Sequence, residues 1–427
     1  MRKLKRIYKN ILERIYVPLL YLVAYIWRRL LFKTTLIGIT GSVGKTTTKE
    51  CISAILSAYF PTLKTLDSRN QSTGVPLTIL QVRPRHKYAV IEIGTGRPGS
   101  IQRLSKLVKP HIAIILAVAK THSKMFTTLE DTAVEKAKIL NSVSAKGLTI
   151  LNAEDPRVKQ MALNSKSKVK MFGLSNELNL WADKISSKWP NRLSLQVNTN
   201  SETQIVNSNL VGEHWINSIL AALLTAINCG IDLKKAVLQL EKVEPFIARM
   251  QPVLIPCGAT IIRDEFNGAF DTLTAAFQVL KEANVKRRVL VMSNVSDSKE
   301  NSRVRFKKLG RIAPQISDLA IFISEYGHYA VKTATEAGMS PDCVKSFIDL
   351  KTANNYLKSE FRDGDLILLK GRSSDHLSRI FFGQHGEINC WKNKCVKMML
   401  CDLCDELKPD FDIQKMLPVE LRKKSPV

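Results

Sequence analysis

Apolar runs of strand length alternate with amphipathic, helix-length stretches in the first half of the chain. The apolar runs cover residues 36–40, 88–93 and 112–118, and residues 46–59 and 101–108 between them show helical spacing of apolar side chains. Strands that are apolar on both faces and separated by helices are typical of a parallel sheet covered on both sides. The pattern therefore predicts an α/β fold.

A second series of the same kind follows residue 250, and the two series join near Glu244 and Pro245. Its predicted strands are residues 259–262, 288–292, 319–323, 344–348 and 366–369. A chain of 427 residues has room for two or three domains of roughly 100–200 residues each. We expect a terminal segment (1–33), a central α/β domain with a mainly parallel sheet (34–244), a Rossmann-like α/β domain (245–385) and a cysteine-rich tail (386–427).

Basic residues outnumber acidic ones, which narrows the range of expected partners. The chain has 64 Lys+Arg against 38 Asp+Glu, a formal net charge of +26. Such an excess favours nucleic acid, an anionic membrane or a phosphorylated substrate without choosing among them. Residues 1–33 alone hold nine Lys or Arg and one Glu, a net charge of +8. The 45% hydrophobic composition and the dispersed Gly and Pro exclude a fibrous or wholly disordered chain.

The N-terminal segment combines positive charge with an apolar run. Residues 15–27 are apolar and Arg28 and Arg29 follow directly, so the run is shorter than the ~20 residues of a membrane-spanning helix. No small-residue cleavage site follows it, as a signal peptide would require. We expect residues 1–33 to lie in the interface of an anionic membrane and to hold the chain at the cytoplasmic face of the plasma membrane. A helix packed on the protein's own surface is the alternative.

The strongest chemical motif joins the first predicted strand to its helix and reads GITGSVGKTT over residues 38–47. Glycines let backbone N–H groups approach phosphate oxygens at the start of a helix, so we expect a nucleoside triphosphate site. Lys45 would reach the β/γ-phosphates, and the Thr46 hydroxyl would ligate Mg²⁺. The GxxGK spacing is shorter than the strict GxxxxGK pattern. The residues expected at the site are Gly41, Ser42, Gly44, Lys45, Thr46 and Thr47.

The loop TGSVGKTTTKE resembles that of the Mur ligase family, the ATP-dependent amide-forming enzymes of cell-wall assembly, and the branch that adds D-alanyl-D-alanine is the most similar. Further similar motifs run in order along residues 36–380. They are NQSTGVPLT (70–78), YAVIEIG (88–94), a Thr-His pair with the helix after it (121–138), LNAEDP (151–156), RMQ (249–251), DEFN (264–267) and KGRS (370–373). The resemblance implies a central P-loop ATPase domain followed by the Rossmann-like domain.

The chain also departs from the family pattern. Members that act on UDP-linked muropeptides carry a uridine-nucleotide-binding domain before the loop, whereas some 35 residues precede it here. Trp215 follows His214 where the family has Asn, and an Asn-Val-Ser stretch begins at Asn294 in place of the family's GDM. The resemblance therefore implies the ATP chemistry without the standard uridine site.

The resemblance assigns roles to several residues of the central domain. ATP would convert a carboxylate into an acyl phosphate, which an amine then attacks. Lys45 would neutralise the transferred phosphoryl group, while Thr46 and Glu92 would bind Mg²⁺. His122 would hold a second metal ion. Lys136, on a predicted helix at 130–140, would be carbamylated and thus anionic; an exposed helical lysine is the alternative reading.

Nucleotide and acceptor contacts are implied outside that group. Asn152 and Asp155 would contact the adenosine, and Arg249 and Asp264 would reach the phosphates and ribose when the two domains meet. Lys370 and Arg372 are the candidates for binding the acceptor. The expected partners are a cell-wall-type carboxylate substrate and an amine or amino-acid acceptor.

Eight cysteines fall into two groups. Four lie close together in the tail with spacings that suit a structural zinc ion; reduced cysteines and a redox pair are the alternatives. The predicted zinc ligands are Cys390, Cys395, Cys401 and Cys404. The others are scattered in apolar surroundings, where we expect them in the core: Cys51, Cys229, Cys257 and Cys343.

Two other classes of function remain to be weighed against an ATP-dependent carboxylate–amine ligase. A basic P-loop module could bind nucleic acid, but that reading predicts aromatic residues interleaved with the basic ones, and none are present. We therefore expect no nucleic acid partner. A membrane-attached scaffold without activity would be consistent with the departures at Trp215 and Asn294.

Overall fold

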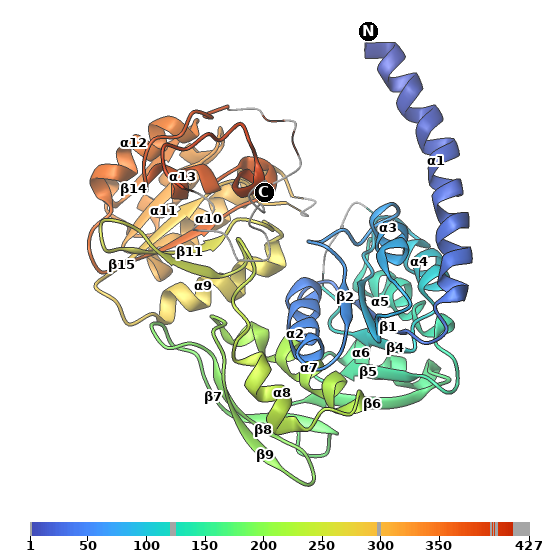
Figure 1. Cartoon of the computed structure of the whole chain (residues 1–427). Helices are drawn as coiled ribbons and strands as arrows, with labels where there is room; N and C mark the ends of the chain where they lie inside the picture. Colours follow the sequence, from blue (N-terminus) through green and yellow to red (C-terminus); the bar gives the residue numbers. More distant parts are fainter. Residues whose placement is uncertain are drawn as a thin grey trace. The chain divides into compact units, whose positions relative to one another are not determined.

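The computed structural model in Figure 1 describes residues 2–119, 125–296, 300–392, 395, 397 and 400–412. The chain divides into two compact units. Unit 1 contains Met1–Ser186, Leu193–Asn209 and Glu213–Glu244, and unit 2 contains Ser187–Arg192, Leu210–Gly212 and Pro245–Val427. Each unit is an α/β structure built on its own sheet, as predicted.

Unit 1 is built on a nine-stranded sheet of order β2-β3-β1-β4-β5-β6-β7-β8-β9 within the described residues. Its strands are β1 (Thr35–Thr40), β2 (Thr62–Lys64), β3 (Tyr88–Glu92), β4 (Ile112–Ile115), β5 (Leu148–Asn152), β6 (Lys168–Gly173), β7 (Leu180–Ser186), β8 (Ser194–Asn198) and β9 (Thr203–Asn207). Neighbouring strands from β2 to β7 are parallel, whereas β7–β8 and β8–β9 are antiparallel.

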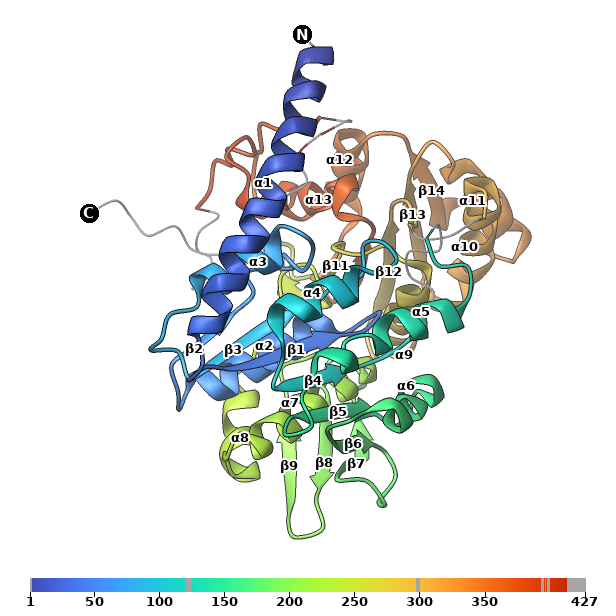
Figure 2. The same ribbon diagram turned by 90° about the vertical axis from the view of Figure 1, so that its right-hand side faces the viewer.

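Helices cover both faces of the parallel strands. They are α1 (Arg2–Leu30), α2 (Lys45–Ser57), α3 (Gly74–Gln81), α4 (Ser100–Val108), α5 (Leu129–Ala137), α6 (Pro156–Gln160), α7 (Ile216–Asn228) and α8 (Leu233–Leu240). Helices α3, α4 and α5 lie on one face in Figure 2, and α2 contacts α7 and α8 on the other. Because the strands are buried between two helix layers, their side chains are apolar on both faces.

Helix α1 packs one side of its C-terminal half on α3 and α4 (Figures 1 and 2). Leu20 and Ala24 are buried there. The Trp27 indole donates to the Val82 carbonyl at 2.8 Å, and Arg28 donates to the Val108 carbonyl at 2.7 Å. Among the described residues, no helix combines the length and the apolarity of a membrane span.

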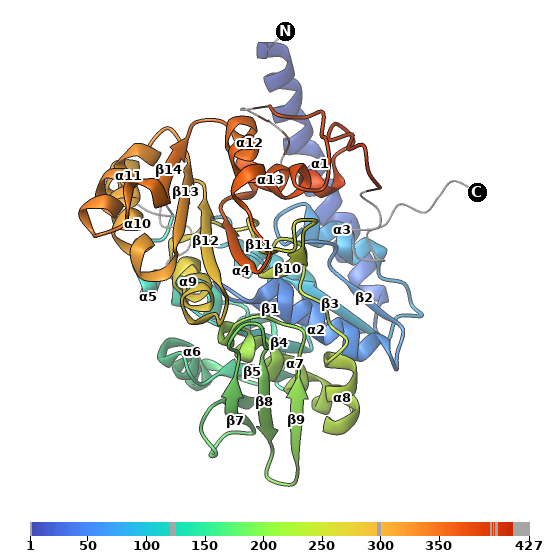
Figure 3. The same ribbon diagram turned by 90° about the vertical axis from the view of Figure 1, so that its left-hand side faces the viewer.

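Unit 2 is built on a six-stranded sheet of order β10-β11-β15-β12-β13-β14, seen in Figure 3, again counting described residues. Only β10 runs antiparallel to its neighbour. The strands are β10 (Gln251–Leu254), β11 (Thr260–Asp264), β12 (Arg287–Met292), β13 (Leu319–Ile323), β14 (Val344–Phe347) and β15 (Asp365–Lys370). The helices are α9 (Leu273–Glu282), α10 (Ser302–Ile316), α11 (Gly327–Glu336), α12 (Leu350–Glu360) and α13 (Ser378–Gly383).

The tail after α13 packs into the core of unit 2. Ile388, Cys401 and Leu407 belong to the same apolar cluster as the β11 and β15 side chains. A short 3₁₀ turn, η7 (Cys401–Leu403), is its only regular element in the described residues. The tail is thus an integral part of unit 2.

Candidate active site

The predicted phosphate loop lies between the end of β1 and the start of α2. Gly44 caps the helix with a φ of +83°, in the left-handed region that favours glycine. A Cβ atom there would lie 3.3 Å from Ser218 Oγ. The first turn of α2 holds no acidic residue, so the positive end of its dipole is not neutralised from within the helix. This geometry suits an anion.

Lys45 lies over this loop. Its ammonium donates to the carbonyls of Gly41, at 2.8 Å, and Ser42, at 3.3 Å. Ser42 is fixed by two hydrogen bonds: its hydroxyl accepts from the Ala119 N–H at 2.9 Å and donates to the Ala119 carbonyl at 3.1 Å. The loop is therefore hydrogen-bonded to the chain that follows β4, and the Lys45 ammonium is fixed beside the N-terminus of α2.

Thr46 and Glu92 meet at the C-terminal edge of the sheet. Glu92 pairs in register with Ile39 of β1 and is 1% exposed. The Thr46 hydroxyl donates to Glu92 Oε2 at 3.1 Å, and Asn70 Nδ2 donates to Glu92 Oε1 at 2.7 Å. Asn70 was not predicted as a site residue, although it begins the NQSTGVPLT motif. A hydroxyl and a carboxylate side by side are hard oxygen ligands of the kind Mg²⁺ uses.

Lys136 is buried in unit 1, not exposed on the helix surface. It is 2% exposed, and its ammonium lies 3.5 Å from Thr95 Oγ1. Burial holds the pKa of Lys136 well below its usual range, and the positive charge of Lys45 acts in the same direction. The neighbouring Glu135 is engaged elsewhere, because it accepts from the N–H groups of Gly99 and Ile101, each at 2.9 Å.

The predicted adenosine contacts are occupied by internal hydrogen bonds. Asn152 Nδ2 donates to the Leu116 carbonyl at 2.8 Å. Asp155 caps α6 by accepting from the Arg157 N–H at 3.0 Å, and its other oxygen accepts from the Val118 N–H at 2.7 Å. Both residues thus shape the chain that leaves β4 and β5.

Two further predictions concern the central domain. Thr47 is buried in the first turn of α2. The predicted metal ligand His122 lies outside the described residues.

In unit 2, Asp264 and Lys370 end neighbouring strands and pair with each other. Lys370 Nζ donates to Asp264 Oδ2 at 2.5 Å, and the other Asp264 oxygen accepts from the Met250 N–H at 3.2 Å. Lys370 is 1% exposed and also donates to the Asn267 carbonyl at 2.9 Å. Arg249 lies beside this group with its guanidinium 4.2 Å from the Phe266 ring centroid.

Arg372 is the more accessible of the two predicted acceptor residues. Its side chain is 37% exposed and forms an ion pair with Asp375 at 2.6 Å. Asp375 in turn accepts from the Ser293 hydroxyl at 2.7 Å and from the Asn294 N–H at 3.0 Å. The loop after β15 is therefore tied to the end of β12.

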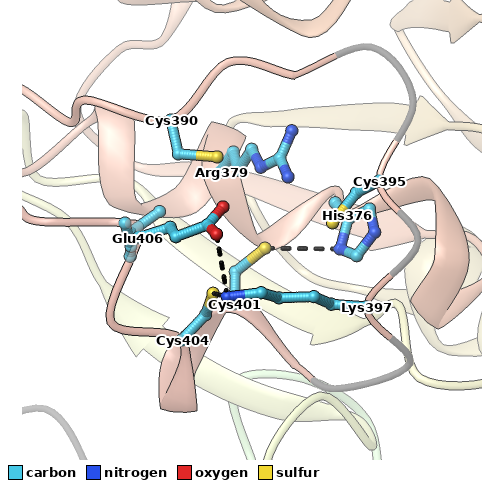
Figure 4. A pocket seen from close by; sticks show the side chains of 9 residues that line it. His376, Arg379, Cys390, Cys395, Lys397, Cys401, Cys404 and Glu406 are labelled. Carbon is cyan, nitrogen blue, oxygen red and sulfur yellow. Dashed lines mark hydrogen bonds and ion pairs between the residues drawn. The ribbon is translucent and has the colours of Figure 1, made fainter.

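All eight cysteines are free thiols. Figure 4 shows the four tail cysteines around one pocket, although in the described residues no three His, Cys, Asp or Glu side chains form a ready-made metal site. The prediction that the other four lie in the core holds only for Cys51; Cys229 and Cys343 are half-buried and Cys257 is exposed. Cys257 lies in the turn between β10 and β11. These two strands form an antiparallel hairpin that was not predicted.

Fold and loop geometry define an α/β protein with a phosphate-binding type of strand–helix junction. Family models match both units: the Mur ligase middle domain over residues 39–226, and the Mur ligase glutamate ligase domain over residues 248–373. The chain belongs to the Mur ligase family, as its motifs predicted.

Several relatives of this chain are named as ligases. The UDP-N-acetylmuramoyl-tripeptide–D-alanyl-D-alanine ligase of Mycobacterium bovis is 27% identical, covering 81% of this chain and 72% of its own length. The Escherichia coli ligase of the same name is 28% identical, covering 73% and 69%. Among solved structures, MurF from Acinetobacter baumannii gives a TM-score of 0.76 at 27% identity over 85% of this chain and 79% of its own.

A MurF ligase from Thermotoga maritima, solved in complex with ADP, has the same fold, with a TM-score of 0.74 at 20% identity over 86% of this chain and 82% of its own. These comparisons confirm the predicted class of enzyme, an ATP-dependent amide-forming ligase of the family that builds peptidoglycan precursors. They favour neither the nucleic acid module nor the scaffold.

Proposed function

We propose that this ligase activates a carboxylate of a cell-wall-type precursor as an acyl phosphate and joins it to the amine of a short peptide or amino acid. The contact between Thr46 and Glu92 beside the α2 N-terminus is the observation that carries the proposal, because it puts Mg²⁺-type ligands next to an anion site. The relatives are named for a muramoyl tripeptide and D-alanyl-D-alanine. We carry over the chemical class of both substrates.

The proposed reaction has two steps. A substrate carboxylate oxygen attacks the γ-phosphorus of ATP, and ADP leaves. The amine then attacks the acyl carbon, phosphate leaves, and the nitrogen loses a proton. Charge neutralisation and positioning are the protein's tasks, and we assign the γ-phosphoryl charge to Lys45 and the loop N–H groups.

The residues around Glu92 fit a magnesium ion. The Glu92 carboxylate is buried, and the side chains that donate hydrogen bonds to it in the described residues, Thr46 and Asn70, are neutral. Thr46 and Glu92 would hold the ion, and His122 remains the proposed ligand of a second. When bound, Mg²⁺ would neutralise phosphate charge. Arg249 and Asp264 remain the proposed contacts of unit 2 with the nucleotide.

We further propose that Lys136 is carbamylated. Its neutral amine nitrogen would attack CO₂, forming an N–C bond and releasing one proton, and the product is a carbamate anion. The lowered pKa of Lys136 supports this, since only the unprotonated amine reacts. For the acceptor, Arg372 is our candidate carboxylate-binding group because Lys370 is buried against Asp264.

The N-terminal helix is our proposed membrane contact. The outward face of α1 presents five large apolar side chains at helical spacing, each more than half exposed: Ile15, Leu19, Leu22, Ile26 and Leu30. With the net charge of +8 in residues 1–33, this face suits the interface of an anionic membrane.

Vesicle binding tests the membrane proposal. The full chain should co-sediment with phosphatidylglycerol vesicles and much less with phosphatidylcholine vesicles. Leu22→Glu should weaken binding, whereas Leu163→Glu, at a residue 84% exposed elsewhere on unit 1, should not. Equal effects of the two substitutions would argue against a specific role for the α1 face.

Turnover tests the ligase. ADP formation from ATP·Mg²⁺ should require both a muropeptide carboxylate and an amine such as D-alanyl-D-alanine, with a new amide detected by mass spectrometry. Lys45→Ala should lower the rate by ~10²–10³, and Lys166→Ala, on the surface of the same unit, should leave it unchanged. Turnover that depends only on DNA or RNA would refute the proposal.

A further inference from the structure

The pocket in the tail of unit 2 has no part in the ligase chemistry proposed above. It lies between α13 and η7, and it is lined by the four tail cysteines together with His376, Arg379, Lys397, Glu406 and Leu407 (Figure 4). Lys397 Nζ donates to Cys404 Sγ at 3.6 Å. The cavity has a volume of about 10 Å³, which is enough for about one water-sized particle. A pocket of that size admits a single ion and excludes an organic ligand.

The thiols come from two directions. Cys401 begins η7 and Cys404 follows it, with the Cys404 N–H donating to the Cys401 carbonyl at 3.0 Å. Side chains three residues apart in a 3₁₀ turn lie above one another, so these two thiols share one side of the turn. Cys390 and Cys395 reach the same pocket from the segment after α13.

Two buried nitrogen atoms at the pocket have no hydrogen-bond partner among the residues that the structure describes. They are Nε2 of His376, which is 5% exposed, and Nε of Arg379, which is 1% exposed. The Arg379 guanidinium does donate to the Lys392 carbonyl, but within the described residues no carboxylate pairs with it. A buried cation without a counter-charge is unfavourable by several kcal/mol.

The buried Arg263 of the same unit, in contrast, has carboxylate partners that compensate its charge. Arg263 donates to both oxygens of Asp402, at 2.7 and 3.0 Å, and to Glu265 Oε1 at 2.8 Å. Its charge is therefore fully compensated. Arg379, on α13, has no such ion pair in the described residues, because the carboxylate that lines the same pocket, Glu406, pairs with Lys392 and Lys397 instead.

We infer that the tail pocket is a structural zinc site in which Cys390, Cys395, Cys401 and Cys404 are the ligands and Arg379 is the buried counter-charge. One Zn²⁺ with four thiolates carries a net charge of −2, which gives Arg379 the anion it lacks. His376 Nδ1 lies 3.4 Å from Cys401 Sγ, and in the tautomer that carries its proton on Nδ1 it would donate to that ligand sulfur. Because the thiols line the pocket without forming a ready-made site, metal binding draws them together.

The site also explains how the tail is held. Asp402, between two ligands in η7, is the bidentate partner of Arg263 on β11. Zinc and this ion pair would fix the same turn from two sides, so metal removal should loosen the tail from unit 2 while the described parts of unit 1 keep their packing.

Metal analysis of the full chain tests the inference. Protein purified with zinc in the medium should contain about one zinc per chain, and Cys401→Ser and Cys404→Ser should each lose it. Cys257→Ser, at an exposed cysteine of the same unit, is the matched control and should retain it. Wild-type protein that is folded, reduced and free of zinc after growth in zinc would overturn the inference.

Two measurements on the wild-type protein test the ligand set independently of whether a variant folds. Cobalt-substituted wild-type protein should show the absorption of a tetrahedral Co²⁺–thiolate centre. After denaturation and chelation all eight thiols should react with Ellman's reagent; six would reveal a disulfide and contradict the assignment. Zinc that survives Cys395→Ser but is lost in His376→Ala would overturn the four-cysteine ligand set.

Discussion

Replacing Glu92 by Gln removes one negative charge from the proposed magnesium site and keeps the size of the side chain. Glu92 is 1% exposed, and in the described residues it accepts hydrogen bonds from Asn70 and Thr46 without an adjacent Lys or Arg. A carboxylate is therefore buried at a place where nothing in the described chain neutralises it. We expect Glu92→Gln to stabilise the nucleotide-free protein and to abolish magnesium-dependent ATP binding.

The size of the stabilisation follows from two opposing contributions. Burying an ionised carboxylate costs several kcal/mol even after relaxation. Two hydrogen bonds to the charged group return about 1.5–3 kcal/mol each, part of which an amide retains. The net gain for Glu92→Gln is thus about 1–3 kcal/mol in the free energy of unfolding of unit 1. For a unit of this size that corresponds to roughly 2–10 °C in Tm.

Thermal unfolding with and without ATP·Mg²⁺ measures both effects. Parent protein should gain stability from ATP with Mg²⁺, whereas Glu92→Gln should start higher and gain little. Glu50→Gln is the matched control, because Glu50 pairs with Lys49 at 2.9 Å and Lys64 at 2.5 Å, and it should lose stability. A Glu92→Gln protein that is less stable than its parent, or that still responds to Mg²⁺, would refute the reasoning.

Three other substitutions test neighbouring parts of the structure. Asn70→Ala should lower the free energy of unfolding by about 1.5–3 kcal/mol and weaken ATP·Mg²⁺ binding by about tenfold in calorimetric titration; unchanged affinity would exclude Asn70 from positioning Glu92. Because the pKa of Lys136 is lowered in the folded state, the unfolded state binds more protons between that pKa and 10.5, and stability rises with pH. Lys136→Met should therefore be more stable than the parent at pH 7 in urea, with the difference vanishing near pH 10.5; a difference independent of pH would contradict the lowered pKa. Asp402→Asn should cost unit 2 about 1.5–3 kcal/mol in urea unfolding, since it weakens the hydrogen bonds to buried Arg263 but leaves Glu265 as its counter-charge; an unchanged stability would contradict a contribution from this pair.

The strand pattern predicted β1, β3 and β4 of unit 1 and five of the six described strands of unit 2, but it missed β2, β5 and β6 of the parallel part of the first sheet. Residues 319–323 form β13 as expected. The run at 112–118 predicted a longer strand than β4, which ends at Ile115. Beyond it, the Leu116 N–H still donates to the last carbonyl of β1, but the Ala117 carbonyl accepts from the Ser42 N–H of the loop and the Val118 N–H donates to the Asp155 side chain. Apolar composition could not reveal that exchange of partners.

Strands β7 to β9 were not predicted, because their polar and apolar residues alternate less regularly and they depend on antiparallel pairing across loops. Site prediction shows the same division. Thr46 and Glu92 were predicted as magnesium ligands from the family resemblance, and Glu92 also from its position at the C-terminal end of a buried strand. The burial of Lys370 against Asp264 follows from the register of β11 and β15, which no local motif contains.

Most buried charged side chains of this fold have an ion-pair partner within the described chain, and a few do not. Among the described buried acidic residues, Glu135, Glu265, Asp365 and Asp402 each pair with a Lys or Arg. Glu92 does not. Among the described buried basic residues, Lys49, Arg263 and Lys370 have carboxylate partners, whereas Lys136 and Arg379 do not.

The three exceptions lie at the three proposed sites: Glu92 where magnesium would bind, Lys136 where carbamylation would add an anion, and Arg379 beside the four tail thiols. Magnesium and the zinc–thiolate group each carry the charge opposite to that of the residue beside them, Glu92 and Arg379, whereas carbamylation would convert Lys136 itself into an anion. Each uncompensated buried charge lowers the free energy of unfolding by several kcal/mol. Binding of a partner of opposite charge should therefore stabilise the protein. The same feature therefore links the chemistry of unit 1 to the zinc site of unit 2, and substitutions at these residues should raise the stability of the protein without its ligands while they remove function.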